Sequence, residues 1–137
     1  MTNINFWPIL VASLVSFAIG SLWYSPVLFG KEWMALTKIS DKDINDTRAR
    51  GVWKLYIVQF IFTLIMFCVI GFTIATANID SSSDGGFVGF LAWLGFVVPM
   101  QVSGFLWKRH SFKLVLIESI NYLVTLVIGG AIIGAWR

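Results

Sequence analysis

Residues 52–77 read VWKLYIVQFIFTLIMFCVIGFTIATA, and the only charged side chain among them is Lys54. A helix of about 20 apolar residues crosses the ~30 Å hydrocarbon layer of a bilayer, and soluble helices of this length normally keep a polar face. Three further runs have the same character: residues 6–24, 87–107 and 114–136. Because lipid offers no hydrogen-bond partner to an open strand edge, each run is expected to be a membrane-spanning helix.

The composition of the whole chain points the same way. Of its 137 residues, 58% are hydrophobic and 12% are charged, which leaves too few polar side chains to cover a water-soluble surface. We therefore predict an all-α fold: a polytopic membrane protein in which residues 1–137 form one domain, a four-transmembrane-helix antiparallel bundle. The first run is expected to be retained, since residues 1–8 lack the lysine or arginine that begins a signal peptide.

Lysine and arginine are distributed unevenly between the segments outside these runs. The connection at residues 25–51, taken with Lys54, carries six of the ten, the connection at 108–113 carries three, and Arg137 is the last. Cytoplasmic loops of membrane proteins are enriched in these residues. Both connections are therefore expected to face the cytoplasm, with both termini outside it, in the inner (plasma) membrane. Tryptophans near the ends of the runs agree with an interfacial belt: Trp7, Trp23, Trp53, Trp107 and Trp136.

The first connection has an organisation of its own. Ser25-Pro26 should end the first helix, because the residue before proline avoids the α region. Apolar side chains then recur at helical spacing over residues 29–36, beside lysines, which predicts a short interfacial helix at the inner headgroup layer. A loop packed on the bundle is the alternative. Ser40 and Asp43 predict a capping box, and the helix that it starts is expected to continue over 41–77.

Polar side chains gather at one expected depth inside the membrane. Glu118 is the only ionisable residue deep within a run, and such residues are candidates for function. Asn121 and Tyr122 follow it at i+3 and i+4, which puts the three on one helix face. Gln59, Gln101 and Tyr24 are expected near the same depth. We therefore predict that these six side chains converge in the inner leaflet.

Three interpretations of this polar layer are open. It can consist of interhelical hydrogen bonds, with Glu118 reaching toward Lys54, Arg109 or Lys113. It can be a ligand or proton site that opens to the cytoplasm. It can also be a patch that contacts a partner protein.

Small residues at a spacing of four mark places where helices approach closely. The pairs are Gly130 and Gly134, Gly85 and Gly89, and Ser16 and Gly20. Such pairs serve internal packing as readily as dimerisation, so both uses are open. Pro99, inside the third run, predicts a kink and a locally weakened helix.

The chemistry of the chain favours a protein that is not an enzyme. Cys68 and His110 are its only cysteine and histidine, so neither a disulfide nor a Cys/His metal site is expected, and no cofactor is implied. One embedded carboxylate does not assemble an acid–base pair. The net charge of +3 comes from residues that flank the runs, so orientation explains it better than a nucleic-acid partner.

Three stretches carry a family resemblance. Residues 20–34 read GSLWYSPVLFGKEWM, residues 93–99 read WLGFVVP, and Asn121-Tyr122 is followed by Gly130, Gly134 and Trp136. Together they resemble the domain-of-unknown-function 1761 family of small bacterial membrane proteins, over nearly the whole chain. The resemblance implies a four-helix bundle and supplies neither an activity nor catalytic residues.

Two functions are expected from these observations. The first is a non-enzymatic membrane protein, in contact with membrane lipids, that acts through self-association (a homo-oligomer) or as an accessory subunit of a larger membrane assembly. The alternative is a minimal transporter, or a proton or small-molecule carrier, that uses Glu118 in an inner-leaflet polar site and dimerises to enclose a path.

Overall fold

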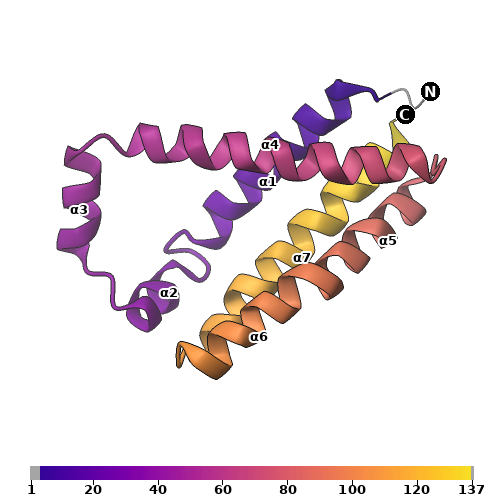
Figure 1. The fold of residues 1–137 in the computed structure, drawn as a ribbon. Coiled ribbons are helices and arrows are strands. Elements are labelled where there is room, and N and C mark those ends of the chain that lie inside the picture. The colour runs from indigo at the N-terminus through magenta and orange to yellow at the C-terminus, as the bar shows by residue number, and fades with distance from the viewer. Residues whose placement is uncertain (1–3, 137) are drawn as a thin grey trace.

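The computed structural model describes residues 4–136, and every regular element in them is a helix (Figure 1). The elements are α1 (Phe6–Trp23), α2 (Gly30–Thr37), α3 (Asp41–Ala49), α4 (Val52–Thr76), α5 (Ser82–Ala92), η1 (Trp93–Val97), α6 (Val98–Trp107) and α7 (Phe112–Ala135). Four helices are long and apolar enough to cross a membrane, with α5, η1 and α6 forming one of them. The predicted all-α polytopic fold is confirmed.

The third of these helices begins earlier than predicted. Its first residue is Ser82 rather than Phe87, because the Ser81 hydroxyl accepts a hydrogen bond from the backbone N–H of Asp84, at 3.2 Å, and caps a polar first turn. The other three helices match the predicted runs closely. Both termini of the described chain lie at the same end of the bundle (Figure 1), as four crossings require. Arg137 lies outside the described residues.

Helix α7 is the centre of the fold. It packs along the helix formed by α5, η1 and α6, and α1 packs on another side of it (Figure 1). The buried core lies where α1, α4 and α7 meet, toward the end that holds the termini. Its members are Ile9, Ala12, Phe67, Ile70, Ile74, Leu126 and Ile133.

The two GxxxG pairs pack against each other, inside the monomer. A Cβ atom added to Gly134 would lie 2.9 Å from the Cα of Gly85, and one added to Gly130 would lie 3.3 Å from the backbone nitrogen of Gly89. Backbones approach this closely only without side chains between them. These four glycines therefore serve the contact of α5 with α7. Ser16 is buried, whereas a Cβ on Gly20 would meet no atom within 4 Å.

Helix α4 packs over only part of its length. Its second half contributes to the core, but all seven residues from 53 to 59 are exposed. Figure 1 shows α4 crossing the bundle at a wide angle, with its first half projecting away from α7. Within the antiparallel bundle, the packing of α4 on the third spanning helix is therefore limited to the region near their connection.

The predicted continuous helix over 41–77 is wrong. The chain turns sharply between α3 and α4 (Figure 1), where Gly51 has φ of +94°, a conformation that other residues rarely adopt. The beginning of α3 is as predicted: Ser40 and Asp43 form the capping box, each side chain accepting a hydrogen bond from the other residue's backbone N–H.

Pro99 weakens its helix as predicted, through a change in helix type. Proline has no N–H to donate to the carbonyl one turn earlier. The preceding residues form η1, a five-residue π-helical turn that joins α5 to α6. The wider turn brings the Trp93 side chain toward α7.

Candidate functional site

One turn of α7 accepts hydrogen bonds from tryptophans on two other helices. The indole N–H of Trp23, at the end of α1, donates to the carbonyl oxygen of Ile117 at 3.0 Å. The indole N–H of Trp93, in η1, donates to the carbonyl oxygen of Ser119 at 2.7 Å. A helical carbonyl has two lone pairs and can take a second donor besides its own helix N–H. These bonds fix α1 and η1 to the same turn of α7.

Glu118, the residue between those two acceptors, joins α2 and α6 to that turn. Its Oε1 accepts from the indole N–H of Trp33 and its Oε2 from the side-chain amide of Gln101, both at 3.3 Å. The prediction that Gln101 and Glu118 meet is confirmed. Lys54, Arg109 and Lys113, the cations considered from the sequence, are not its partners within the described chain.

Sequence reasoning missed Trp33 as a partner of Glu118. The spacing of apolar residues predicted a helix at 29–36, and α2 confirms it, with Lys31 exposed. What the spacing could not show is which polar atom the Trp33 indole would bind. The available signal was chemical, because an indole N–H near the membrane interior needs an acceptor and Glu118 was the strongest one at that depth.

Gln59 does not join Glu118, and that part of the predicted convergence is wrong. Its side-chain amide donates to the hydroxyl of Thr63 on its own helix, at 3.4 Å. Gln59 belongs to the first half of α4. That half diverges from α6 and α7 (Figure 1), which explains why the two side chains do not meet.

A cavity of about 560 Å³ lies between α1, α4 and α7, and we call it the α1–α4–α7 cavity. Tyr24, Gln59, Asn121 and Tyr122, four of the six predicted site residues, line it. Glu118 and Gln101 belong to the neighbouring hydrogen-bonded pair instead. The complete lining is Ser16, Phe17, Gly20, Ser21, Tyr24, Tyr56, Gln59, Phe62, Thr63, Met66, Asn121, Tyr122 and Thr125.

Asn121 is the most unusual residue of this cavity. Its side chain is only 7% exposed, yet its Oδ1 has no hydrogen-bond partner in residues 4–136. The Tyr24 side chain lies close to Asn121, Tyr122 and Glu118, which connects the cavity to the Glu118 pair. A buried acceptor without a donor costs about 1–3 kcal/mol, so any arrangement that brings a donor to Asn121 Oδ1 is favoured.

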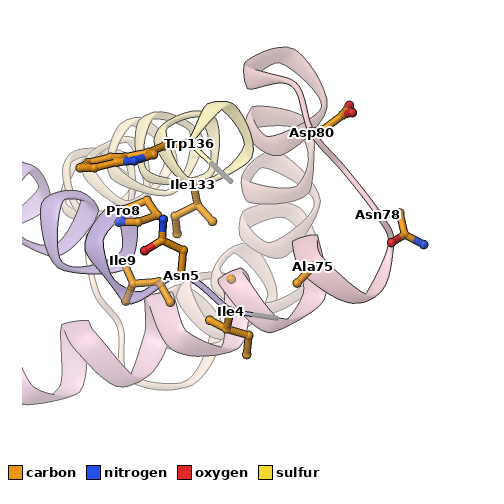
Figure 2. A pocket seen from close by; sticks show the side chains of 10 residues that line it. Ile4, Asn5, Pro8, Ile9, Ala75, Asn78, Asp80, Ile133 and Trp136 are labelled. Atoms are coloured by element: carbon orange, nitrogen blue, oxygen red, sulfur yellow. The ribbon is translucent and has the colours of Figure 1, made fainter. Parts of the chain in front are cut away.

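A second crevice, of about 450 Å³, lies at the end that holds the termini (Figure 2). Pro8, Ile9 and Ile133 give it apolar walls. Figure 2 shows its acidic residue, Asp80, turned away from those walls on the connection after α4. The crevice therefore gathers no polar side chains around one point. Within residues 4–136, no three His, Cys, Asp or Glu side chains lie close enough together to hold a metal ion.

The comparison with known families agrees with the resemblance seen in the sequence. A family model described as "Protein of unknown function (DUF1761)" matches residues 7–134. The chain belongs to this family. Neither the search of curated proteins nor the search of solved structures found a match.

In this DUF1761 protein the stretch at residues 20–34 builds the turn that delivers Trp33 to Glu118. The carbonyl oxygen of Ser25 accepts hydrogen bonds from the N–H groups of Leu28 and Gly30, at 3.1 and 2.9 Å. A Cβ on Gly30 would lie 2.8 Å from the carbonyl carbon of Ser25, so only glycine fits this reversal. The family-like residues therefore place α2 against α7.

Aromatic rings reinforce the same turn. The rings of Trp23 and Phe29 lie 4.7 Å apart between centroids, and those of Tyr24 and Trp33 lie 5.5 Å apart. Such pairs contribute about 0.5–1.5 kcal/mol each beyond the area they bury. Trp23 is thus part of the packed structure, whereas Trp107 is 82% exposed.

Proposed function

We propose that this DUF1761 protein is a non-enzymatic integral membrane protein that acts by lateral association, with a second copy of itself or as an accessory subunit of a larger membrane assembly. The proposal rests on the exposure of one part of the chain, which we call the arm. We define the arm as α3 together with the first half of α4. The arm projects from the bundle (Figure 1), and each of residues 53–59 is exposed. It is the part of the described chain that is best placed to reach another protein.

The face of α4 that points away from the α1–α4–α7 cavity suits a partner helix. Val58, Ile61 and Ile65 recur at i, i+3 and i+7, and they are 52%, 48% and 51% exposed. The two glycine pairs considered for dimerisation already pack against each other, between α5 and α7 of the same monomer. Lipid alone can also cover an apolar face, so the test has to distinguish a protein neighbour from lipid.

Cysteine cross-linking in native membranes makes that distinction. In a Cys68→Ala background, Val58→Cys and Ile65→Cys are treated with a bismaleimide, and Leu106→Cys on α6, where Leu106 is 63% exposed, serves as the matched control. We expect cross-linked species at positions 58 and 65 and only uncross-linked monomer at 106. Dimer mass identifies self-association, and a heavier heteromeric product identifies an accessory role. Equal yields at all three positions would contradict the proposal.

We also propose that both termini lie outside the cytoplasm, at the plasma membrane. The partition of nine lysines and arginines against one supports this orientation. The common position of the described ends at one side of the bundle is compatible with it (Figure 1).

The alternative, a proton or small-molecule carrier that uses Glu118, has less support. Both carboxylate oxygens of Glu118 already accept hydrogen bonds, and Glu118 is not among the residues that line the α1–α4–α7 cavity.

A further inference from the structure

The α1–α4–α7 cavity combines apolar and uncharged polar side chains. Hydroxyl and amide side chains from three helices line it, and none of its lining residues is Asp, Glu, Lys or Arg. A charged group would lose its hydration on entering and would find no counter-ion. The lining therefore selects an uncharged ligand.

The lining offers both acceptors and donors, since the hydroxyls of Tyr24, Tyr56 and Tyr122 can donate as well as accept. The hydroxyls of Ser21, Thr63 and Thr125 donate to carbonyl oxygens of their own helices, at 2.9, 2.9 and 3.1 Å, so their protons are already used while their lone pairs are free to accept. The amide N–H of Gln59 is directed at Thr63. Asn121 Oδ1 adds a buried acceptor without a partner. A ligand hydroxyl, which both donates and accepts, is the complement of such a lining.

The cavity is also open at the side where its lining residues on α4 and α7 are exposed. Tyr56, Phe62 and Tyr122 at its rim are 55%, 62% and 40% exposed, and Phe17 and Met66 give it apolar walls. In a membrane-spanning protein this side faces the acyl chains of the bilayer. Its volume, about 560 Å³, lies within the ~300–1,000 Å³ typical of ligand sites.

We propose that the α1–α4–α7 cavity binds an uncharged glycerolipid with a free hydroxyl group, of which diacylglycerol is the simplest. The hydroxyl donates to Asn121 Oδ1, and the acyl chains leave past the exposed lining residues of α4 and α7. This site is separate from the α4 face proposed for association, and neither proposal depends on the other.

Native mass spectrometry of the full-length protein, released from mild detergent, tests the ligand class. The probes are dioleoylglycerol, its 3-O-methyl ether and dioleoylphosphatidylcholine. We expect a one-to-one adduct with dioleoylglycerol and about five- to ten-fold weaker binding of the ether, which has lost the hydroxyl donor. Equal binding of the ether, or tighter binding of phosphatidylcholine, would overturn the proposal. The lipid adduct is measured on the mass peak of the monomer, so the result does not depend on whether the protein associates with itself or with a partner.

Asn121→Leu tests the acceptor. Leucine is similar in size and removes the unpaired oxygen, so we expect dioleoylglycerol binding to weaken by about five- to ten-fold while the melting temperature stays the same or rises. A lower melting temperature with unchanged binding would show that Asn121 only supports the fold, which contradicts the proposal.

Substitutions at two glycines test whether the ligand occupies the cavity, and they remove no hydrogen bond. A Cβ added to Gly20, which lines the cavity, or to Gly95, in η1, would meet no atom within 4 Å. Gly20→Leu fills the cavity and is expected to abolish the adduct, whereas Gly95→Leu is expected to keep it. Equal adduct formation by the two variants would refute the site even if Asn121→Leu failed to fold.

Discussion

Replacing Glu118 with leucine is expected to destabilise the protein by about 1–3 kcal/mol. The substitution removes the acceptor of Trp33 and that of Gln101, each at 3.3 Å, and leaves both donors partly buried. Interhelical hydrogen bonds in membrane proteins contribute ~0.6 kcal/mol on average and up to ~1.7. Two such bonds, both long, give the stated range.

Glu118→Gln is expected to cost much less, below about 1 kcal/mol. The new amide oxygen accepts from Trp33, whose indole can only donate. The new NH₂ group would face the NH₂ group of Gln101, but the Gln101 amide can turn over and present its oxygen instead. The carboxylate is therefore replaceable if its role is structural.

Unfolding by SDS in mixed micelles, followed by circular dichroism, measures these differences. Trp33→Phe removes one of the two donors, so the double variant with Glu118→Leu should lose less than the sum of the single losses. Trp107→Phe, at an exposed tryptophan, is the matched control and is expected to change nothing. The reasoning is refuted if Glu118→Leu is as stable as the wild type. Equal destabilisation by leucine and glutamine would show that the negative charge itself is required.

Three other outcomes are expected. Gly130→Ala should destabilise the protein by ~1–3 kcal/mol in the same assay, because a Cβ there meets the backbone of α5, whereas Gly95→Ala, with open space around it, should cause no loss. The hydrogen bonds from Ser40 hold the pKa of Asp43 below its usual value, so the start of α3 should be fully stabilised above pH ~4 and lose protection as the pH falls through the lowered pKa. Amide exchange measures this, and Asp43→Asn should remove the pH dependence. Reporter domains fused after Arg137 should be active only outside the cytoplasm, and cytoplasmic activity would contradict the proposed orientation.

The parts of the fold that follow from local signals were predictable. Length and hydropathy identified the four spanning helices, and the pair Ser40 and Asp43 identified the start of α3. Apolar spacing over 29–36 identified α2. Each of these features depends on residues close together in the chain, so one sequence contains all the information needed.

The path of α4 was not predictable from the same kind of signal. The helix is apolar on all sides, and lipid covers any face equally well, so hydropathy does not indicate which face packs on protein. The break at Gly51 was equally hidden, because a single glycine within a helix costs only about 1 kcal/mol and is often tolerated.

Only part of the candidate site was predictable, because the sequence indicates the depth of a side chain in the membrane but not its direction. Position along a helix gives the depth of a side chain in the membrane, and depth correctly paired Gln101 with Glu118. It does not give the direction in which the side chain points across the bundle. Gln59 shares the expected depth but lies on the diverging α4, so its partner is Thr63 on its own helix.

The contacts of the fold imply that the first half of α4 moves more freely than α1 or α5. Close backbone packing joins α5 to α7, and indole hydrogen bonds join α1 and η1 to α7. The first half of α4 is held to α1 by two edge-to-face ring contacts of Phe17, at 5.7 and 6.1 Å, worth about 0.5–1.5 kcal/mol each. The mouth of the cavity can therefore widen without loss of the bundle. Spin labels at Val58→Cys and Ile128→Cys, in the Cys68→Ala background, should give a broader distance distribution than labels at Leu91→Cys and Ile128→Cys. Equal widths would show that α4 is held as firmly as α5, and that a lipid would need a different route into the cavity.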